Sequence, residues 1–409
     1  MSTATLNSEK RKVSVPKLRF QEFEGEWKQI KLGDYIKIKS GNSPSNYNFI
    51  DKGNYPFIKV EELNNCNKYQ NSSRFYSNEN KNLVEKFSVI FPKRGAAILN
   101  NKVRINDCPI FMDSNMMAII PKRNQLHYEF LYYKIVKEEL YKIADTSSIP
   151  QINNKHIEPY KLFITSLPEQ QKIASFLSAV DEKIQQLSRK KELLKQYKNG
   201  VMQQLFSGKL RFKDENGKDY PDWEEKKLGD VAEKRIVKNK DNKINLVFTN
   251  SAMQGIVNQR DYFDKDIANQ NNLLGYYIVE NNDFVYNPRI STYAPVGPIS
   301  RNYLDTGIMS PLYSVFRFKY GNLDFLEFFF NSIVWHKHMK DISNYGARDD
   351  RMSFSTSDFY KMPIPFPSFE EQQKIAGFLS SIDSKIESVN QQLAQTRTFK
   401  KGLLQQMFV

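Results

Sequence analysis

The sequence predicts an α+β protein in which two unlike globules are joined by two long helices that pack on each other. One observation is a repeated amphipathic phrase, EQQKIASFLSAVDEKI at 169–184 and EQQKIAGFLSSIDSKI at 371–386. Another is that the stretches before the two copies hold strand-like runs and turn clusters but hardly resemble one another. A third is the length of 409 residues with 40% hydrophobic content, which is enough for two or three domains.

The repeat is an internal duplication. A shift of 202 residues aligns 169–206 with 371–408 without a gap, and 17 of the 38 positions are identical. Each copy is preceded by a capping-box pattern, in which a serine stands three residues before a glutamate: Ser166 with Glu169, and Ser368 with Glu371. Each copy is therefore predicted to be one long helix.

Apolar residues in both copies recur at alternating spacings of 4 and 3, which indicates a coiled-coil seam rather than a broad globular face. Because a duplicated chain can fold as its own pseudo-dimer, we expect the helices to pack antiparallel about a pseudo-two-fold axis. Two unrelated core helices are the alternative. The predicted helix-pair interface is Ile173, Leu177, Val180, Ile184, Leu187, Leu194, Val201, Ile375, Leu379, Ile382, Ile386, Val389, Leu393 and Leu403.

A second set of short motifs is also duplicated. LeuArgPhe at 18–20, Trp27 and LeuGlyAsp at 32–34 recur as LeuArgPhe at 210–212, Trp223 and LeuGlyAsp at 228–230. We expect the tryptophans to anchor the two cores and the Gly-Asp pairs to form turns. The predicted domains are a polar tail at 1–15, a first globule at 16–165, a first helix at 166–208, a second globule at 209–367 and a second helix at 368–409.

Inside the globules, runs of apolar, β-branched and aromatic residues predict strands, and two longer segments predict short helices. The predicted strands are 55–60, 87–91, 116–120, 244–249, 276–279 and 312–318, and the predicted helices are 126–143 and 323–341. Turn clusters at 40–46 and 294–298 separate some of these runs.

The composition favours a polyanionic partner and a reducing compartment. The formal net charge is +14 and the pI is about 9.3. Cys66 and Cys108 form no CxxC pair, which favours the cytoplasm. The chain starts with a polar stretch, and its most apolar run, 323–335, is too short to span a bilayer, so we expect a soluble protein.

The motifs of enzymes are incomplete. AsnProArgIle at 287–290 is similar to the loop that holds the target base in DNA amino-methyltransferases, but Arg289 and Ile290 replace a proline and an aromatic residue, and no glycine-rich cofactor loop precedes it. His336 and His338 have no third ligand beside them, so a packing or surface role is expected rather than a metal site. No carboxylate spacing singles out a nuclease centre. We expect binding without catalysis.

The loops carry the binding residues. They are crowded with Arg, Lys, Asn, Gln and Ser, which grip guanine and adenine edges as well as phosphates. The predicted DNA-binding residues are Asn42, Ser43, Asn64, Arg74, Asn101, Lys102, Arg104, Arg289, Ser291, Tyr293, Arg348 and Arg351.

These features together resemble the specificity (S) subunit of type I restriction-modification enzymes. The resemblance covers 16–409 and depends mainly on the two GluGlnGlnLysIleAla helices and on the Trp…LeuGlyAsp motifs. The first helix is entered through ThrSerLeuPro at 165–168 and the second through ProSerPheGlu at 367–370, a departure that affects nothing important. Looser matches are SerGlyAsnSerProSer from 40 and 146–157 in the first globule, and 283–289, 310–316 and 346–368 in the second.

The resemblance implies that each globule is a target-recognition domain that reads one half of a split, asymmetric site on double-stranded DNA. It also implies no catalytic activity in this chain and no cofactor bound by it. Two modification subunits, which bind S-adenosylmethionine and methylate adenine, would hold its helices, and two ATP- and Mg-dependent restriction subunits would complete the complex.

A helix of about 38 residues is roughly 57 Å long, so the helix pair could act as a ruler that keeps the half-sites apart. The same sequence leaves open a stand-alone DNA-binding regulator with a coiled-coil spacer. A methyltransferase fused to its specificity domains and a purely structural tether are further alternatives. A tether predicts that substitution of Arg289 or Arg348 leaves target choice untouched.

Overall fold

The computed structural model describes residues 14–79, 81–146, 149–263, 270–343 and 350–409. Most of the predicted N-terminal tail, and Arg348, lie outside these ranges. The chain divides into two compact units: unit 1 is Met1–Ser188 with Gln391–Val409, and unit 2 is Arg189–Asn390. Each unit therefore contains one globule, half of helix α3 (Leu167–Phe206) and half of helix α9 (Phe369–Gln406).

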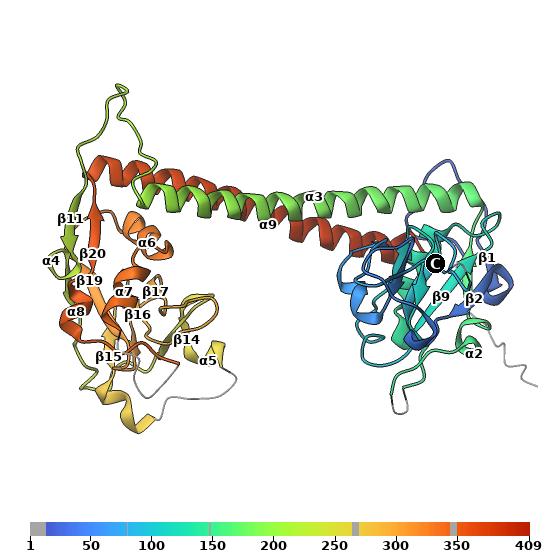
Figure 1. Ribbon diagram of the computed structural model, residues 1–409, viewed down its shortest axis with the longest axis horizontal. Helices are drawn as coiled ribbons and strands as arrows, with labels where there is room; N and C mark the ends of the chain where they lie inside the picture. Colours follow the sequence, from blue (N-terminus) through green and yellow to red (C-terminus); the bar gives the residue numbers. More distant parts are fainter. Residues whose placement is uncertain (1–13, 80, 147–148, 264–269, 344–349) are drawn as a thin grey trace, which may run out of the picture. The chain divides into compact units, whose positions relative to one another are not determined.

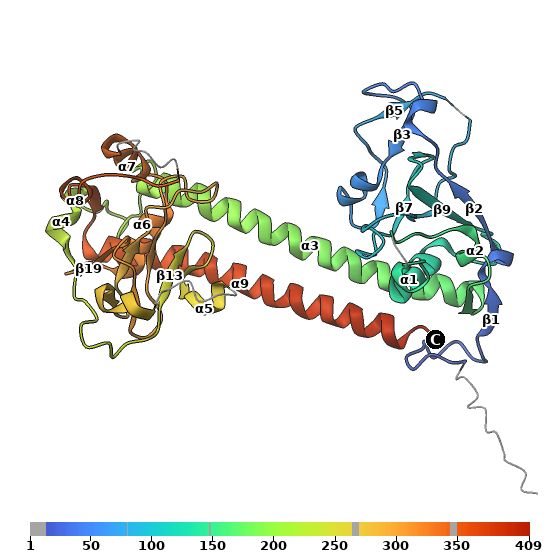
Figure 2. The same cartoon turned by 90° about the horizontal axis from the view of Figure 1, so that it is seen from below.

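The globule of unit 1 is built on a five-stranded sheet in the order β2-β9-β6-β7-β4, with a three-stranded sheet β5-β3-β8 and a two-stranded ribbon β1-β10 (Figure 2). The strands are β1 (Lys28–Lys31), β2 (Ile36–Ser40), β3 (Tyr55–Ile58), β4 (Tyr69–Gln70), β5 (Tyr76–Ser77), β6 (Val89–Pro92), β7 (Arg104–Asn106), β8 (Phe111–Met112), β9 (Met116–Pro121) and β10 (Lys161–Ile164). The helices are α1 (Tyr128–Glu138) and α2 (Asn154–Ile157).

The globule of unit 2 has a four-stranded sheet β12-β19-β16-β17 and three two-stranded ribbons, β11-β20, β13-β14 and β15-β18 (Figure 1). The strands are β11 (Glu224–Lys227), β12 (Ala232–Lys234), β13 (Phe248–Ser251), β14 (Gly255–Asn258), β15 (Tyr277–Val279), β16 (Phe284–Tyr286), β17 (Ile299–Arg301), β18 (Gly307–Met309), β19 (Ser314–Phe318) and β20 (Pro363–Phe366). The helices are α4 (Leu228–Val231), α5 (Gln259–Tyr262), α6 (Leu323–Asn331), α7 (His336–Ile342) and α8 (Thr356–Tyr360).

The secondary structure predicted from sequence is confirmed in type, with shorter elements. Each predicted strand contains or overlaps an observed one, and the predicted helix at 323–341 is two helices, α6 and α7. The LeuGlyAsp motifs were predicted to be turns. They form single helical turns instead, the 3₁₀ helix Leu32–Tyr35 in unit 1 and α4 in unit 2.

The ribbons β1-β10 and β11-β20 are equivalent features of the repeat. In each, the strand that follows the tryptophan pairs antiparallel with the strand that leads into a long helix, as with Ile30 opposite Leu162 and Lys226 opposite Ile364. Each ribbon therefore joins the first and last segments of its globule at the start of the helix.

The helix halves pack in opposite directions within each unit. In unit 1, Leu177 and Val180 of α3 share a core cluster with Leu403 and Met407 near the end of α9. In unit 2, Met202 and Leu205 near the end of α3 share a core cluster with Ile375 and others near the start of α9. An early turn of one helix thus lies in the same core as a late turn of the other, which confirms the predicted antiparallel arrangement.

Two ion pairs repeat this relation. Lys198 Nζ lies 2.7 Å from an Asp383 carboxylate oxygen in unit 2, and Lys400 Nζ lies 2.5 Å from Asp181 Oδ1 in unit 1. The residues of one pair are those of the other shifted by 202. Each lysine also lies over an aromatic ring of its own unit, Phe328 at 4.8 Å and Tyr133 at 5.6 Å, so it links both helices to the globule of that unit.

The glutamates that start the repeated phrase do not complete capping boxes. The backbone N–H of Glu371 donates to Ser368 Oγ at 3.3 Å, but its buried carboxylate accepts hydrogen bonds from Arg211 and, at 2.8 Å, from Trp223 Nε1. Glu169 is held by Arg19 in the same way, at 2.8 Å. The LeuArgPhe motif is therefore the partner of the GluGlnGln motif.

The glutamine that follows each of these glutamates fastens the helix to the globule. The backbone N–H of His127, before α1, donates to Gln170 Oε1, and the backbone N–H of Asn322, before α6, donates to Gln372 Oε1, both at 2.8 Å. Gln170 and Gln372 are fully buried. These contacts explain why the phrase stays the same while the globules differ.

Candidate nucleic-acid interface

The loop between β2 and η2 (Pro44–Asn46) in unit 1 carries two of the predicted DNA-binding residues. It is tied down because the backbone N–H of Asn42 donates to Met112 O, and because a Cβ on Gly41 would lie 1.9 Å from Asp113 O. Asn42 Nδ2 donates to the hydroxyl of Tyr47, whose ring lies 4.7 Å from that of Phe111. Ser43 is exposed on this anchored loop.

Two predicted arginines of unit 1 are fastened to the segment 61–66. Arg74 Nε donates to Glu62 Oε1 at 2.8 Å, and its guanidinium also pairs with Glu61, although the side chain is 62% exposed. Arg104 Nε donates to the main-chain oxygen of Cys66 at 2.8 Å. Asn64, the last residue of η3 (Val60–Asn64), is exposed beside them. The two arginines therefore hold this segment in place.

Asn101 has a structural role that the sequence did not reveal. Its Nδ2 donates to Val136 O at 2.9 Å, and its Oδ1 accepts from the backbone N–H of Leu140 at 3.0 Å, so the side chain holds the end of α1. Its φ of 47° is the left-handed conformation of a tight turn. Asn101 is therefore not among the residues free to contact DNA, and the neighbouring Lys102 is half-buried.

The structure brings Arg289 and Arg351 of unit 2 together across an antiparallel bridge. The backbone N–H of Ile290 donates to Asp350 O at 3.0 Å, and that of Met352 donates to Pro288 O at 2.9 Å. The side chain of Arg289 is 66% exposed, and both arginines lie about 4 Å from the Asp350 carboxylate. One carboxylate facing two guanidiniums leaves net positive charge at this edge.

The loop that holds Ser291 and Tyr293 has a rigid base. Asn287 Nδ2 donates to Asn250 O at 2.8 Å, and buried Asn250 donates in turn to Val285 O. Gly297 has φ +79°, and a Cβ there would lie 2.0 Å from Asn287 O, so no other residue fits. Tyr293, 72% exposed, stands on this frame.

A hollow of about 640 Å³ borders that loop in unit 2. It is lined by the turn between β13 and β14, by the loop from Thr292 to Ser300, and by the link between α6 and α7. Met253 is 71% exposed on the first of these, and Gln254 beside it is exposed as well. A tyrosine ring such as that of Tyr293, already predicted to bind DNA, can stack on a base, and the hollow adds two candidates: Gln254, because a glutamine can read adenine, and Met253, because an apolar side chain can contact a thymine methyl group.

Met253 and Gln254 were missed because they lie in a segment without basic residues. The signal that could have found them is SerAlaMetGlnGly at 251–255, a hairpin turn that ends in a glycine and exposes a methionine. Gly255 has a φ of +67° in that turn.

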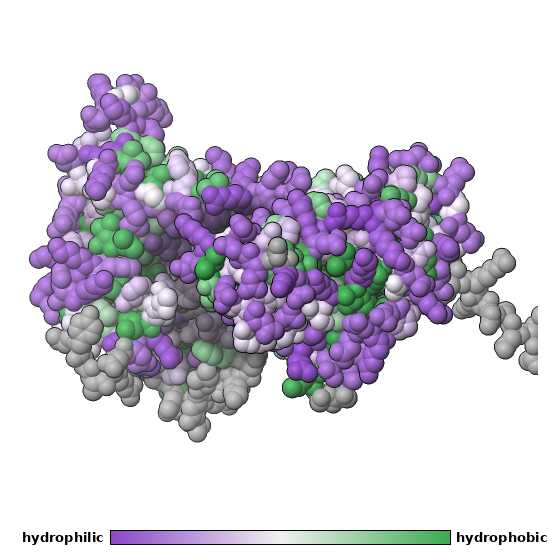
Figure 3. Space-filling model, turned by 45° about the vertical axis from the view of Figure 1, so that its right-hand side comes forward, coloured by the Kyte–Doolittle hydropathy of each residue, from purple (hydrophilic) through white to green (hydrophobic). Residues whose placement is uncertain are grey.

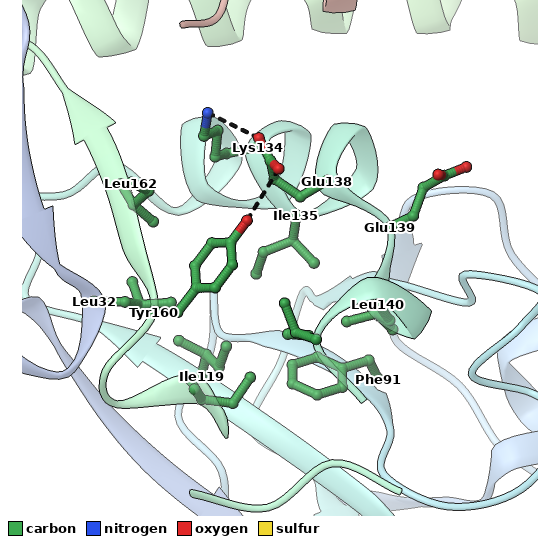
Figure 4. Close-up of a pocket in the computed structure, with 12 residues that line it drawn as sticks. Leu32, Phe91, Ile119, Lys134, Ile135, Glu138, Glu139, Leu140, Tyr160 and Leu162 are labelled. Atoms are coloured by element: carbon green, nitrogen blue, oxygen red, sulfur yellow. Dashed lines mark hydrogen bonds and ion pairs between the residues drawn. The ribbon is translucent and has the colours of Figure 1, made fainter. Parts of the chain in front are cut away.

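A narrow cavity inside unit 1 is too small for a ligand (Figure 4). It lies between the sheet and the end of α1, is about 20 Å³ in volume, and is lined mostly by apolar side chains such as Phe91, Ile119 and Leu140. That space holds about one water molecule. At its rim, Tyr160 donates to Glu138 Oε2 and Lys134 pairs with Glu138, both at 3.0 Å. Burial raises the pKa of the Tyr160 hydroxyl, so it stays a neutral donor.

The two histidines that were not expected to bind a metal make local contacts. His338 has a ring nitrogen 3.0 Å from Asp358 O, and His336 packs edge-on against Trp335. In the described ranges, no three His, Cys, Asp or Glu side chains gather as metal ligands. Within those same ranges, no helix is long and apolar enough to cross a membrane. The face seen in Figure 3 is mainly hydrophilic, with small apolar patches.

Comparison with known proteins decides the family. The model of the type I restriction modification DNA specificity domain matches the chain twice, over residues 24–196 and 220–396. The chain belongs to this family. Both matches contain one globule and the larger part of the helix that follows it, so the duplication seen in the sequence is a duplication of the family's domain.

Two relatives agree, one along most of the chain and the other along less than half of it. The specificity subunit of the type I restriction enzyme MjaVIII from Methanocaldococcus jannaschii is 24% identical over 416 residues, with 94% of each chain covered. The specificity subunit of EcoR124I/EcoR124II from Escherichia coli is 25% identical over 195 residues, which are 44% of this chain and 47% of that protein.

Solved structures share the fold. The S subunit of a type I restriction-modification system from M. genitalium matches with a TM-score of 0.54 and 16% identity, over 97% of this chain and 99% of that one. A chain from a study of complex assembly and conformational transition in a type I system matches with a TM-score of 0.58 and 14% identity, over 93% and 97%. The fold of this specificity-domain pair is therefore the fold of S subunits.

Proposed function

We propose that this chain is the DNA-specificity subunit of a type I restriction-modification complex and that it reads a bipartite, asymmetric double-stranded target. The observation that carries the proposal is the match of both halves to the specificity-domain family, although their globules differ in sheet order and loops. Because the two repeats share their helices but differ in their globules, we expect the two globules to bind two different half-sites. We take 16–165 and 209–367 as the recognition domains and 166–208 and 368–409 as the helices between them.

The reading is assigned to exposed or half-buried side chains on loops that are hydrogen-bonded to the rest of their globule. In the second domain these are Arg289, Arg351 and Tyr293, with Met253 and Gln254 across the hollow. In the first they are Ser43, Asn42 and Asn64. Arginine forms bidentate hydrogen bonds with guanine edges, and asparagine and glutamine form them with adenine edges. The hydrogen-bonded loop backbone holds these side chains in the positions that such bonds require.

The catalytic work is assigned to other subunits. We propose that the chain binds no cofactor itself, and that it acts in the cytoplasm with two modification subunits that use S-adenosylmethionine and two restriction subunits that use ATP and Mg. The support is the role of S subunits in the family resemblance and the complex assembly described for a structural relative. The spacing role is assigned to α3, whose 40 residues are about 60 Å long.

The test is single-molecule methylome sequencing of a host that expresses this chain with its modification subunit. We expect methylated adenine in a motif of two unlike half-sites separated by a fixed number of unread bases. A continuous motif, or a palindrome, would contradict the proposal.

A stand-alone DNA-binding regulator remains the second candidate because the loops and charge alone do not require partners. It predicts tight, sequence-specific binding by the purified chain in the absence of the modification subunit. A filter-binding or fluorescence-anisotropy titration with and without that subunit separates the two functions.

A further inference from the structure

The main sheets of the two globules differ in order by strand β4, which unit 1 adds at one edge, but their other four strands correspond. The order β2-β9-β6-β7 in unit 1 matches β12-β19-β16-β17 in unit 2. The register matches as well, because a shift of 195 residues relates β6 to β16 and a shift of 197 relates β9 to β19. Positions in one globule can therefore be assigned to positions in the other, although the two sequences hardly resemble one another.

A backbone bridge follows β6 in unit 1, at the place where the bridge of Arg289 with Arg351 follows β16 in unit 2. In unit 1 the paired residues are Arg94 and Gln151. Two hydrogen bonds join the residues on either side of this pair: Gly95 N donates to Pro150 O at 2.8 Å, and Ile152 N donates to Lys93 O at 2.9 Å. The same two bonds flank the pair in unit 2. Arg94 and Arg289 are also 195 residues apart, so Arg94 is the counterpart of Arg289.

This bonding pattern places the two side chains of each bridge next to each other. Residues that lie between such flanking bonds form a non-hydrogen-bonded antiparallel pair, with Cα atoms about 4.5 Å apart and side chains on one face. The residues that follow Gln151 and Arg351 are Ile152 and Met352, and both are buried. Because side chains alternate along extended backbone, the paired side chains point away from the core.

Arg94 has no role inside its own unit. Its side chain is exposed, and within the described part of the chain it makes no hydrogen bond or ion pair. Gln151 opposite it is half-buried, and its backbone is bonded on the other side as well, since Gln151 and Asp145 exchange two N–H to O bonds of 2.9 Å. A charged side chain without a partner, on backbone that is held from both sides, is available for a ligand.

The bridge in unit 1 adjoins the loop that carries Asn42. The backbone N–H of Lys93 donates to Asn115 O at 2.8 Å, and Asn42 forms a parallel bridge with Asp113. The short segment 113–115 thus contacts both. Arg94 therefore extends a surface of unit 1 to which DNA contacts are already assigned.

We propose that Arg94 and Gln151 are specificity-determining residues of the first recognition domain, at the position that Arg289 and Arg351 occupy in the second. The inference rests on the proposed function and deepens it, because both domains then contact DNA at the same place in the fold through different side chains. An arginine suits guanine and a glutamine suits adenine. The two side chains begin about 5 Å apart, and base pairs are stacked about 3.4 Å apart, so the pair contacts one base pair or two neighbouring ones.

The test is the binding of the full complex to a panel of DNA duplexes, measured by fluorescence anisotropy. Each duplex carries the motif that methylome sequencing gives for the unchanged chain, with one base pair altered. For Arg94→Ala, we expect discrimination to fall at least about fivefold at one or two base pairs of one half-site. Gln151→Ala should lose discrimination at the same base pair or at its neighbour, and Arg289→Ala should affect the other half-site only.

Arg123→Ala is the matched control. Arg123 is another exposed arginine of the same globule, but it follows β9 at the end of the sheet opposite to Arg94, where it donates to Lys86 O. Its substitution should leave discrimination unchanged at every base pair. Arg94→Ala should keep the melting temperature of the unchanged chain, because the Arg94 side chain bonds to nothing in the described part of unit 1.

The inference is overturned if Arg94→Ala weakens binding to all duplexes equally, which is the result of a phosphate contact or of a merely structural role. Unchanged discrimination with Arg94→Ala overturns it too, as does a loss confined to the half-site that Arg289→Ala affects. Failure of the proposed function gives a different result, since the unchanged chain would then yield no bipartite motif from which to build the panel.

Discussion

Glu169 and Glu371 show how single residues fix the frame. Each carboxylate is buried at the start of a long helix and accepts charge-assisted hydrogen bonds from an arginine about 150 residues away in sequence. The two sites are not identical, because Trp223 Nε1 also donates to Glu371, while Trp27 Nε1 is buried without a hydrogen-bond partner in the described structure. Glu371 therefore also anchors the tryptophan of its repeat, whereas the second donor to Glu169 is the nearby Thr165 hydroxyl.

Replacing Glu371 with glutamine should lower the free energy of unfolding by about 3 kcal/mol, because the buried ion pair with Arg211 loses one charge. Glu370→Gln is the matched control, since Glu370 is the exposed neighbour in the same turn, and it should change stability by less than about 0.5 kcal/mol. Urea denaturation followed by circular dichroism measures both. Equal effects of the two substitutions would contradict this role of Glu371.

Substitution of Arg289 by alanine should change or relax one half of the methylated motif and leave the other half unchanged. The reason is that Arg289 is exposed and belongs to unit 2, which is expected to read one half-site only. A lost bidentate contact with a base costs about 1–3 kcal/mol of discrimination. Methylome sequencing of the variant reads both halves at once. Lys361→Ala, an exposed lysine in the same unit that pairs with Asp358, is the control and should leave the motif intact. An unchanged motif with Arg289→Ala would favour the structural-tether alternative.

At the scale of elements, the sequence was sufficient for the helices because their periodicity is long and strong. Ten of the fourteen predicted seam residues are buried, and the other four, Ile184, Leu194, Val201 and Ile386, are half-buried. The capping-box prediction was wrong for the glutamate side chains, which bind Arg19 and Arg211 instead of the backbone at the start of the helix. A local sequence pattern does not reveal a partner that is distant in sequence. Strand order was not predicted, because pairs such as β3 with β8 join segments more than 50 residues apart.

Because the helices pack antiparallel, a test of the spacing role has to lengthen both of them. Each helix has one half in each unit, so a heptad inserted into α3 alone would leave α9 too short to remain docked in both cores. Seven residues inserted into both helices, after Ser188 and after Asn390, should keep the two half-sites unchanged and lengthen the unread gap. Methylome sequencing of the double insertion gives the gap. Altered bases within a half-site would contradict the spacing role.

At the scale of the whole molecule, the net charge of +14 predicts binding that weakens steeply with salt. Each phosphate neutralised by Lys or Arg releases about 0.9 counterion from duplex DNA, so the logarithm of affinity should fall linearly with the logarithm of salt concentration. Anisotropy titrations of the complex between about 50 and 200 mM salt test this, with a fall of at least about tenfold expected for a few phosphate contacts. A flat response would count against phosphate contacts by the basic loops.

The candidate site was only partly predictable from sequence. Composition located the right loops, and the pairing of Arg289 with Arg351 follows from a bridge that joins segments about 60 residues apart. Sequence could not distinguish an asparagine that faces solvent from Asn101, which holds a helix end. It also passed over Met253, because the segment around this residue contains no basic residue.

The ribbons β1-β10 and β11-β20 have a consequence for how such chains acquire new targets. Because the entry and exit strands of a globule are hydrogen-bonded to each other, the polypeptide between them is a cassette whose two ends meet. An exchanged or resized insert between Lys31 and Lys161 closes on the same ribbon, provided that it keeps the contacts to the helices that His127 and Tyr133 now make. With those contacts kept, the DNA target can change over evolutionary time without a change in the two long helices.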